Sequence, residues 1–445
     1  MVQNLPVYDI IDKENTEKHT GQTIRRRFLQ RIGVRQTNTV SPPRAVAALL
    51  DIFASAGAEA YIVGGAVRDS LAGRRVHDWD VASPLPPEAM GELFRGHGYR
   101  VIPTGIKHGT VTVISDGMPV EITAFRIDGA YTDGRHPDRV EFTTRIEDDL
   151  ARRDFTVNAM AYSPRSGICD PFGGRADLAA GVIRCVGDAR TRFTEDALRI
   201  LRAFRFAAQL GYTIEDGTLG AAAALASRLE LISAERIAAE TEKLLLAPEP
   251  SGYLAAAESC GVLAYVFPGI TFDASDLAPV DQLAADAPLR MGAMLRRTGL
   301  ADSERAAAVL RGLRLSNADR RRAYASAAQT LPPAEPYAVR RFLRETADPD
   351  AAIAAAAARG ESGAAEVAEI ARQTAAEGGP VTLRTLAVDG AKLRAAGYPT
   401  GRQMGKLISA LLEAVTADPS LNTEEALLAL AAKLTDEQKT ERNDI

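Results

Sequence analysis

Residues 61–83, YIVGGAVRDSLAGRRVHDWDVAS, decide the fold that we expect for this chain of 445 residues. The apolar run at residues 61–63 predicts a short buried strand, which Gly64 and Gly65 bring to an end. Residues 67–69 then begin a predicted helix. Glycines before the N-terminus of a helix allow backbone N–H groups to approach a phosphate. The segment therefore predicts a strand and a helix joined by a turn that suits a phosphate group.

Asp78 and Asp80 follow this helix, separated by Trp79. In a strand, residues i and i+2 project from the same face, so we expect the two carboxylates to lie together. Carboxylates that close repel each other unless a cation lies between them. Mg²⁺ commonly binds one or two carboxylates together with substrate phosphates. A glycine turn or an Asp-x-Asp pair alone is common without function, but together they favour nucleotidyl or phosphoryl transfer.

Composition limits the remaining possibilities. A chain of 445 residues is too long for one core and predicts two to four domains. The net charge of −5 gives no general basic field for nucleic acid, so contact with RNA would need local basic patches. Cys169, Cys185 and Cys260 lack metal-ligand spacing and fit a reducing compartment. We see no membrane-spanning stretch and no signal peptide pattern, and we expect a cytoplasmic protein.

Two more strands are predicted at residues 110–114 and 120–125, after a helix at residues 86–96. Glu121 faces away from its apolar neighbours in the second of these strands. On a strand beside the Asp78 pair, its carboxylate is a candidate third metal ligand. An exposed glutamate at a sheet edge is an equally good interpretation of the same pattern.

Two basic motifs come next in the chain. Residues 151–162, ARRDFTVNAMAY, place two arginines, an aspartate and an asparagine at a predicted helix start. Residues 194–210 predict one strong helix with Thr194 as its N-cap. One stripe of that helix would carry Glu195, Arg199, Arg202 and Phe206, with Asp196 close to Arg199. Such a stripe is usually a solvated face, but its arginines also suit a nucleotide-binding surface.

Seven motifs in this order resemble those of bacterial class II CCA-adding enzymes, which are tRNA nucleotidyltransferases. They are GGAVRD, DWD, TGIKHGTVTV, RRDFTVNAMAY, DPFGG, EDALRILRAFRF and ISAERIAAE, within residues 42–246. The resemblance implies an α+β fold, in which a polymerase β-like nucleotidyltransferase head with a mixed sheet precedes an all-α neck, body and tail. The implied parts are a polar leader (1–40), the head (41–186), the neck (187–250), the body (251–330) and the tail (331–445).

The resemblance also implies the roles of individual residues. Asp78 and Asp80 would hold Mg²⁺, with Glu121 as the third catalytic carboxylate. The implied nucleotide-binding residues are Gly64, Gly65, Arg68, Arg153, Asp154, Asp196, Arg199, Arg202 and Arg205. Residues 131–140 match the loop that the family uses in passing from CTP to ATP.

Base selection by Asp196 and Arg199 can be argued from chemistry. Cytosine and adenine each present an amino donor beside a ring-nitrogen acceptor, which a carboxylate and a guanidinium match. Uracil and guanine reverse both groups and would leave the pair mispaired. The expected function is template-free addition of CCA to the 3′ end of tRNA from CTP and ATP. The expected mechanism is two-metal in-line transfer that releases pyrophosphate.

Beyond residue 250, helical segments rich in alanine are expected to bind the acceptor arm of tRNA. Basic residues that could contact its phosphates are Arg296, Arg297, Arg320, Arg321, Arg322, Arg340, Arg341 and Lys406. All five histidines lie at or before residue 136, which excludes a metal-dependent HD phosphohydrolase domain in the later part.

Three other functions remain open. One is a bacterial poly(A) polymerase, and another is an enzyme that adds only A or only CC. The third is a non-catalytic RNA-binding protein on an inactive transferase scaffold. The presence of Asp78, Asp80, Asp196 and Arg199 argues against the third.

Overall fold

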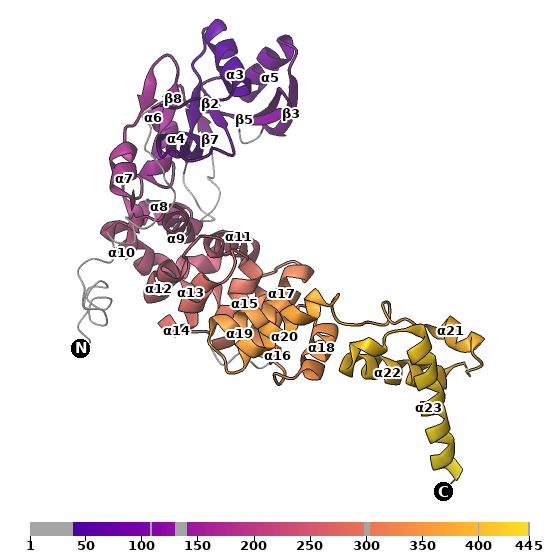
Figure 1. Ribbon diagram of the computed structural model, residues 1–445. Coiled ribbons are helices and arrows are strands. Elements are labelled where there is room, and N and C mark those ends of the chain that lie inside the picture. Colours follow the sequence, from indigo (N-terminus) through magenta and orange to yellow (C-terminus); the bar gives the residue numbers. More distant parts are fainter. Residues whose placement is uncertain (1–38, 107–108, 130–139, 298–302, 399, 444–445) are drawn as a thin grey trace, which may run out of the picture. The chain divides into compact units, whose positions relative to one another are not determined.

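The structure, a computed structural model, describes residues 39–445 except for 107–108, 130–139, 298–302, 399 and 444–445 (Figure 1). The predicted leader and the predicted loop at residues 131–140 lie almost wholly outside these residues. The chain divides into two compact units, Met1–Asp273 and Ala274–Ile445. The finer division into five parts stays a prediction. No helix in the described ranges has both the length and the apolarity to cross a membrane.

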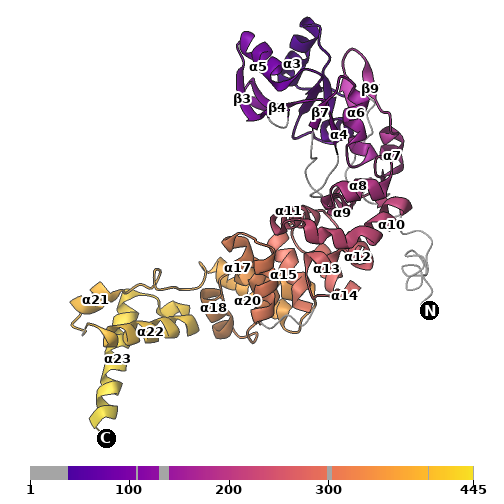
Figure 2. The ribbon, with the colours of Figure 1, turned by 180° about the vertical axis from the view of Figure 1, so that it is seen from behind.

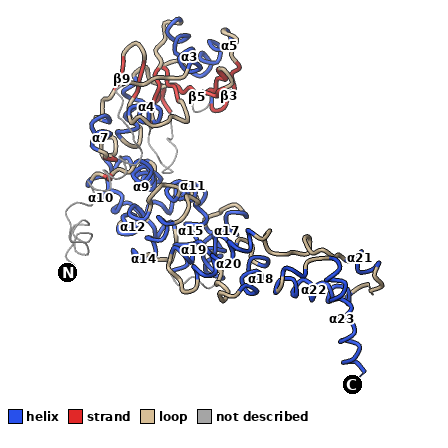
Figure 3. Tube along the Cα trace, viewed as in Figure 1, coloured by secondary structure: helices blue, strands red, loops and turns tan. Residues whose placement is uncertain are grey.

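A seven-stranded mixed sheet forms the core of the first unit. Its strands are β1 (Tyr61–Val63), β2 (Asp80–Ser83), β3 (Arg100–Gly105), β4 (Thr110–Ser115), β5 (Met118–Ala124), β8 (Ala161–Ser163) and β9 (Gly167–Cys169). Their order is β3-β4-β5-β2-β1-β8-β9, and only β2 and β5 run parallel to each other. The predicted α+β fold is confirmed, and Figure 3 shows the strands, in red, within the first unit.

Two small sheets complete the strands of this unit. Antiparallel β6 (Arg126–Asp128) and β7 (Val140–Phe142) form one of them. Parallel β10 (Val182–Ile183) and β11 (Thr213–Ile214) form the other. In the second pair, β10 follows the large sheet in the chain and β11 follows α9. This pairing therefore connects the sheet segment with the helices that come after it.

Helices account for most of the rest of the first unit. They are α3 (Arg44–Ser55), α4 (Gly65–Leu71), α5 (Pro87–Gly96), α6 (Ile146–Ala151), α7 (Gly174–Ala180), α8 (Ala189–Glu195), α9 (Leu198–Leu210), α10 (Asp216–Leu225), α11 (Ala234–Leu245), α12 (Ser251–Ser259) and α13 (Leu263–Val266), with 3-10 helices at Thr156–Asn158 and Ala226–Leu231. Both views show α3 and α5 side by side (Figures 1 and 2). Phe53 and Phe94 pack edge to face between them, with ring centroids 5.1 Å apart. The helices predicted at residues 44–56 and 86–96 are confirmed.

The strand register gathers several sequence motifs at one edge of the sheet. Val63, at the end of β1, pairs with Asp80 at the start of β2 and with Ala161 at the start of β8. Asp80 in turn pairs with Glu121 of β5. The Gly-Gly turn after β1, the carboxylates and the segment before β8 therefore meet at this edge.

The helix predicted over residues 194–210 is wrong, because the chain forms two helices there. Helix α8 ends at Glu195 and α9 begins at Leu198. Asp196 between them is extended, with φ −141° and ψ 103°, and its Oδ1 accepts a hydrogen bond from the Leu198 backbone N–H at 3.1 Å. Aspartate side chains compete in this way with helical hydrogen bonds, which explains the break. Thr194 is not an N-cap, and Asp188 caps α8 instead.

The prediction of a helix start within residues 151–162 is also wrong. Helix α6 ends at Ala151, and only one 3-10 turn, Thr156–Asn158, precedes β8. Asp154 accepts hydrogen bonds from the Phe155 backbone and the Asn158 side chain, so local side-chain bonds fix an irregular backbone here.

The second unit is helical throughout its described part. Its helices are α14 (Ala274–Leu277), α15 (Ala287–Arg297), α16 (Ser303–Gly312), α17 (Asn317–Ala328), α18 (Pro336–Glu345), α19 (Pro349–Ala358), α20 (Ala364–Ala376), α21 (Gly390–Ala395), α22 (Arg402–Ala417) and α23 (Glu424–Asn443), with 3-10 helices at Ala278–Gln282 and Pro419–Leu421. Leu289 of α15 and Ala355 of α19 share one apolar cluster. Leu411 of α22 and Leu427 of α23 share another.

Gly292 permits the close contact between α15 and α17. A Cβ at this position would lie 2.2 Å from the Ala323 backbone oxygen and 2.5 Å from the Ser326 Cβ. We expect Gly292→Ala to lower the free energy of unfolding by about 1–3 kcal/mol, because overpacking displaces a helix backbone. Denaturant unfolding of the full chain measures this. Gly405→Ala on α22 is the control, because its Cβ meets nothing within 4 Å; equal stability of both variants would contradict the prediction.

Candidate active site

Three carboxylates lie together at the sheet edge. Asp80 begins β2 and pairs in register with Glu121 on the neighbouring strand β5. Asp78 precedes β2, so the expectation that both aspartates project from one strand is wrong. It nevertheless lies near enough for its charge to act on Asp80. All three side chains are exposed. Half-buried Trp79, the one tryptophan of the sequence, lies between the two aspartates.

The electrostatics of Asp80 suit a cation. Desolvation by the surrounding protein raises its pKa, while the positive charge of Arg153 lowers it. The negative charges of Glu121 and Asp78 add to the increase in pKa, which stays the net direction. Within the described residues, no group of three or more His, Cys, Asp or Glu side chains is placed so that it could hold a metal ion by itself. The donor set fits a divalent ion such as Mg²⁺, which completes its coordination with substrate phosphates and water.

The glycine turn brings a guanidinium close to these carboxylates. Gly64 is the N-cap of α4, with φ 70° and ψ −131°, and Gly65 is the first residue of the helix. A Cβ on Gly64 would lie 2.6 Å from the Arg153 Nη1. The Arg153 side chain is itself held by the buried Asp149, at 3.4 Å. Because Gly64 has no Cβ, the Arg153 guanidinium can lie close to the turn and beside Asp80.

We expect Gly64→Ala to weaken both folding and the site. The positive φ of Gly64 disfavours any L side chain, and such strain costs roughly 1–3 kcal/mol. The added methyl group would also displace the Arg153 guanidinium. The measurements are the free energy of unfolding and the KM for nucleotide. Gly57→Ala, whose φ is also positive at 72° but whose Cβ meets nothing, separates the two effects. A normal KM in Gly64→Ala would contradict the role of Arg153.

A buried chain of hydrogen bonds links α4 to α9. Arg68 donates from Nη1 to the Asn158 Oδ1 at 2.6 Å, and Asn158 donates to the Asp154 Oδ1 at 3.1 Å. The Asp154 Oδ2 accepts from the Arg202 Nε at 2.9 Å and from its Nη2 at 2.5 Å. Burial alone would raise the pKa of Asp154, but Arg202 and Asn158 hold it far below its usual range. Asp154 is therefore an anion that orients two guanidinium groups.

Phe206 of α9 is surrounded by arginines. The guanidinium carbon of Arg205 lies 3.5 Å from its ring centroid, and those of Arg68 and Arg202 each lie 5.2 Å away. Arg205 also donates to the buried Glu240 of α11 at 2.8 Å. Three cations thus lie around one aromatic ring. Each is also paired with a carboxylate: Arg68 with Asp69, Arg202 with Asp154 and Arg205 with Glu240. Arg205 belongs to this cluster, although its hydrogen bonds go to Glu240 of α11 and to Gln209 of α9.

The predicted base-recognition pair is not joined side chain to side chain. Arg199 donates to the Glu195 Oε2 at 2.8 Å and to the Arg152 backbone oxygen at 2.9 Å. The Asp196 Oδ2 accepts instead from the Arg236 Nη2 at 3.0 Å. Glu195 and Arg199, which we expected on one stripe of a single helix, instead pair across the break between α8 and α9. The side chains of Asp196 and Arg199 are both partly exposed. A carboxylate and a guanidinium are therefore accessible together at the break between the helices.

The structure adds residues that the sequence analysis did not select for the site. Asn158, Asp149 and Glu240 are buried polar side chains that hold the predicted arginines. Asn158 and Glu240 stand in the quoted motifs RRDFTVNAMAY and ISAERIAAE. For Asn158, a polar residue within an apolar run was the available signal, but Glu240 is followed by Thr241 and Glu242 and had none. No local pattern indicated Asp149 or the contact between Asp196 and Arg236, because these depend on tertiary packing.

Comparisons with known proteins agree with this geometry. A family model described as the poly A polymerase head domain matches residues 60–184. Another, described as a probable RNA and SrmB-binding site of polymerase A, matches residues 211–273. A CCA-adding enzyme from Limosilactobacillus fermentum is 35% identical over 401 residues, which are 87% of this chain and 96% of that protein. The chain belongs to the CCA-adding enzyme family.

Other CCA-adding enzymes match in part or in structure. That of Leuconostoc mesenteroides is 48% identical over 218 residues, 49% of this chain and 53% of the relative. The chain thus spans about half the length of the Leuconostoc relatives that it matches. The crystal structure of the Bacillus stearothermophilus CCA-adding enzyme in complex with CTP aligns with a TM-score of 0.74 at 30% identity, over 90% of this chain and 100% of that one.

Proposed function

We propose that this protein adds CCA to the 3′ end of tRNA from CTP and ATP without a nucleic-acid template. The observation that carries the proposal is the sheet edge at which three carboxylates lie beside Arg153 and the glycine turn. Membership of the CCA-adding enzyme family supports the substrates. In the proposed reaction, the tRNA 3′-hydroxyl attacks the α-phosphate of the nucleotide, and pyrophosphate leaves.

The chain's own residues bind and orient the reactants in this proposal. Asp78 and Asp80 are the proposed ligands of Mg²⁺, with Glu121 as a third catalytic carboxylate. Metal ions bound there would stabilise the attacking and leaving oxygens as Lewis acids. Gly64, Gly65, Arg68 and Arg153 would bind the triphosphate, and Asp154, Arg202 and Arg205 would complete the nucleotide site. The hydrogen-bond chain from Arg68 to Arg202 keeps these cations in fixed positions. Their side chains therefore lose little conformational entropy when a nucleotide binds.

Asp196 and Arg199 are the proposed base-recognition residues. We expect Asp196→Ala to lower kcat/KM for CTP and ATP by up to about 100-fold, because an unmade hydrogen bond at a polar site costs about 1–3 kcal/mol. Discrimination against UTP should fall in parallel. Single-nucleotide extension kinetics measure both quantities. Asp216→Ala, an exposed change at the start of α10, should leave the kinetics unchanged, and an intact preference for CTP in Asp196→Ala would rule out the role.

A primer-extension experiment tests the proposed function. Three tRNA transcripts, ending at the discriminator base, at C and at CC, are incubated with Mg²⁺ and with each nucleotide or with CTP plus ATP. We expect the shortest transcript to grow by three nucleotides and then stop. Extension of only the CC transcript by one A would identify an A-adding enzyme, and long A ladders would identify a poly(A) polymerase. No extension of any transcript would exclude the enzymatic function.

The proposed cofactor and location need separate support. We propose Mg²⁺ because carboxylates and phosphate oxygens are its preferred ligands. We propose a cytoplasmic location, supported by the tRNA substrate and by Cys169, Cys185 and Cys260, which are all free thiols. Omitting Mg²⁺ from the primer assay, with Ca²⁺ in its place, tests the first proposal.

A further inference from the structure

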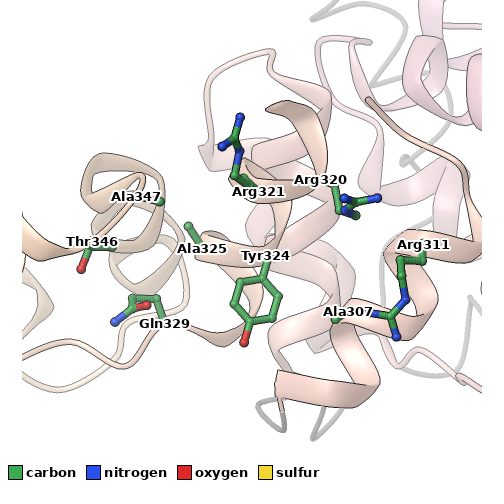
Figure 4. Close-up of a pocket in the computed structure, with 9 residues that line it drawn as sticks. All are labelled: Ala307, Arg311, Arg320, Arg321, Tyr324, Ala325, Gln329, Thr346 and Ala347. Carbon is green, nitrogen blue, oxygen red and sulfur yellow. The ribbon is translucent and has the colours of Figure 1, made fainter. Parts of the chain in front are cut away.

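The second unit contains a cavity of about 310 Å³ that is remote in sequence from the residues of the sheet edge (Figure 4). It lies between α16, α17 and the segment after α18. The residues that line it are Ala307, Arg311, Arg320, Arg321, Tyr324, Ala325, Gln329, Thr346 and Ala347. In Figure 4, Tyr324 lies between Gln329 on one side and Arg311 on the other. A volume of this size accommodates one nucleobase with its sugar and phosphate.

The three arginines of this cavity carry charge that the described residues do not neutralise. Neither Arg311 nor Arg321 takes part in an ion pair within the described part of the chain, and Arg320 donates only to the neutral Asn317 Oδ1, at 2.8 Å. None of the lining residues is acidic. The cavity therefore has a net positive charge at its rim.

Other arginines of the second unit are paired with carboxylates. Arg296 pairs with Glu361, Arg322 with Asp286 and Asp348, Arg340 with Glu377, Arg341 with Glu345, and Arg344 with Glu413. Of the arginines that the sequence analysis proposed for phosphate contact, Arg320 and Arg321 thus differ from their neighbours. Unpaired guanidinium groups are the ones available to donate two parallel hydrogen bonds to a phosphate.

The floor of the cavity is apolar and carries one aromatic ring. Tyr324 and Ala325 follow Arg320 and Arg321 by four residues on α17, so ring and guanidinium groups occupy one face of the helix. Ala307 of α16 and Ala347 complete the apolar lining. Nucleobases stack on aromatic side chains in a sequence-tolerant way, while a basic rim follows the phosphate backbone.

We propose that this cavity binds one nucleotide unit, with its base against Tyr324 and its phosphate at Arg311, Arg320 and Arg321. A nucleotide of the RNA substrate and a free nucleotide both have this chemistry. The RNA source rests on the proposed function. The site is separate from the nucleotide site in the first unit, because every lining residue belongs to Ala274–Ile445.

The first arm of the test uses the full chain and a fluorescently labelled tRNA transcript ending at the discriminator base. Tyr324→Ala is expected to weaken binding about tenfold, and Tyr324→Phe to keep it, because stacking needs only the ring. Arg321→Gln is expected to weaken binding and to lower the slope of log K against log salt by about 1. In extension assays KM for tRNA should rise while kcat stays unchanged.

The second arm tests free nucleotide without RNA. The protein is irradiated with 8-azido-ATP and the modified peptides are mapped by mass spectrometry. Labelling of the α17 peptide that Arg321→Gln reduces would support a free nucleotide as the ligand. Arg372→Gln is the control for both arms, because Arg372 is exposed on α20 and paired with Glu369 at 2.6 Å. Arg321 is exposed, so its substitution is not expected to unfold the chain, and circular dichroism verifies this.

The outcomes separate the two proposals. If the wild type fails to extend tRNA but the α17 peptide is labelled, the proposed function fails and the nucleotide site stands. If the wild type extends tRNA, yet Tyr324→Ala and Arg321→Gln bind it as tightly as Arg372→Gln and no label reaches α17, the cavity is not a nucleotide site.

Discussion

Asp80→Asn is expected to reduce the rate of nucleotide addition about 10³-fold, because Lewis-acid stabilisation is worth several kcal/mol and about 1.4 kcal/mol corresponds to a factor of ten. Desolvation raises the pKa of this carboxylate, and the negative charges of the neighbouring Glu121 and Asp78 add to that increase. Asparagine removes the charge that would attract a cation and keeps the size of the side chain. Because Asp80 is exposed at the start of β2, the fold is expected to survive the change.

Single-turnover extension of a tRNA transcript measures this effect. The matched control is Asp51→Asn, the same chemical change at an exposed position of α3. We expect the control to keep wild-type rates and both variants to keep wild-type stability. A rate for Asp80→Asn within tenfold of the control would remove Asp80 from the proposed metal ligands.

Asp154→Asn is expected to lower the free energy of unfolding by about 3 kcal/mol, the lower end of the range for a broken buried ion pair. It removes the buried carboxylate that Arg202 contacts directly, and only Glu240, at 3.8 Å, remains near that guanidinium. The Asp154 carboxylate is 8% exposed and accepts hydrogen bonds from Arg202, Asn158 and the Phe155 backbone. An amide cannot accept at both positions, and its own protons have no partner there. KM for nucleotide should rise as well, since Arg202 and Asn158 lose their fixed positions.

The pH dependence of this loss has a definite sign. The pKa of Asp154 is lowered in the folded chain, so its stabilisation is complete above the unfolded value of about 3.9. It is lost as the pH falls through the lower, folded pKa. The difference between wild type and Asp154→Asn in urea unfolding should therefore shrink below about pH 4. Asp188→Asn at the exposed cap of α8 is the control, because asparagine caps helices nearly as well; an equal loss in both variants would refute the buried pair.

Local pattern was sufficient for the elements around the site. Three apolar residues followed by Gly64 and Gly65 predicted β1, the turn and α4, because burial and backbone freedom act over a few residues. The carboxylate cluster was predicted in composition but not in geometry. Its pairing of Asp80 with Glu121 depends on β2 and β5 being neighbours, which periodicity does not specify.

The break at Asp196 shows why the helix boundary and the contacts between distant segments could not be predicted from the sequence. The sequence around it has strong helical spacing, and one side-chain bond to the Leu198 backbone was enough to interrupt it. Arg236, which follows 40 residues later in the chain on α11, also donates a hydrogen bond to the Asp196 carboxylate. The same holds for Glu240 with Arg205. Contacts of this kind are set by packing between distant segments, so they leave no periodic signal in the chain.

The position of Trp79 has a practical consequence for spectroscopy. Because the sequence has one tryptophan and it lies between Asp78 and Asp80, all intrinsic emission excited beyond the tyrosine absorption band originates at the carboxylate cluster. Its indole is half-buried and thus sensitive to local polarity. Titration of the unlabelled protein with a divalent salt would therefore follow ion binding directly, with no reporter dye and no turnover.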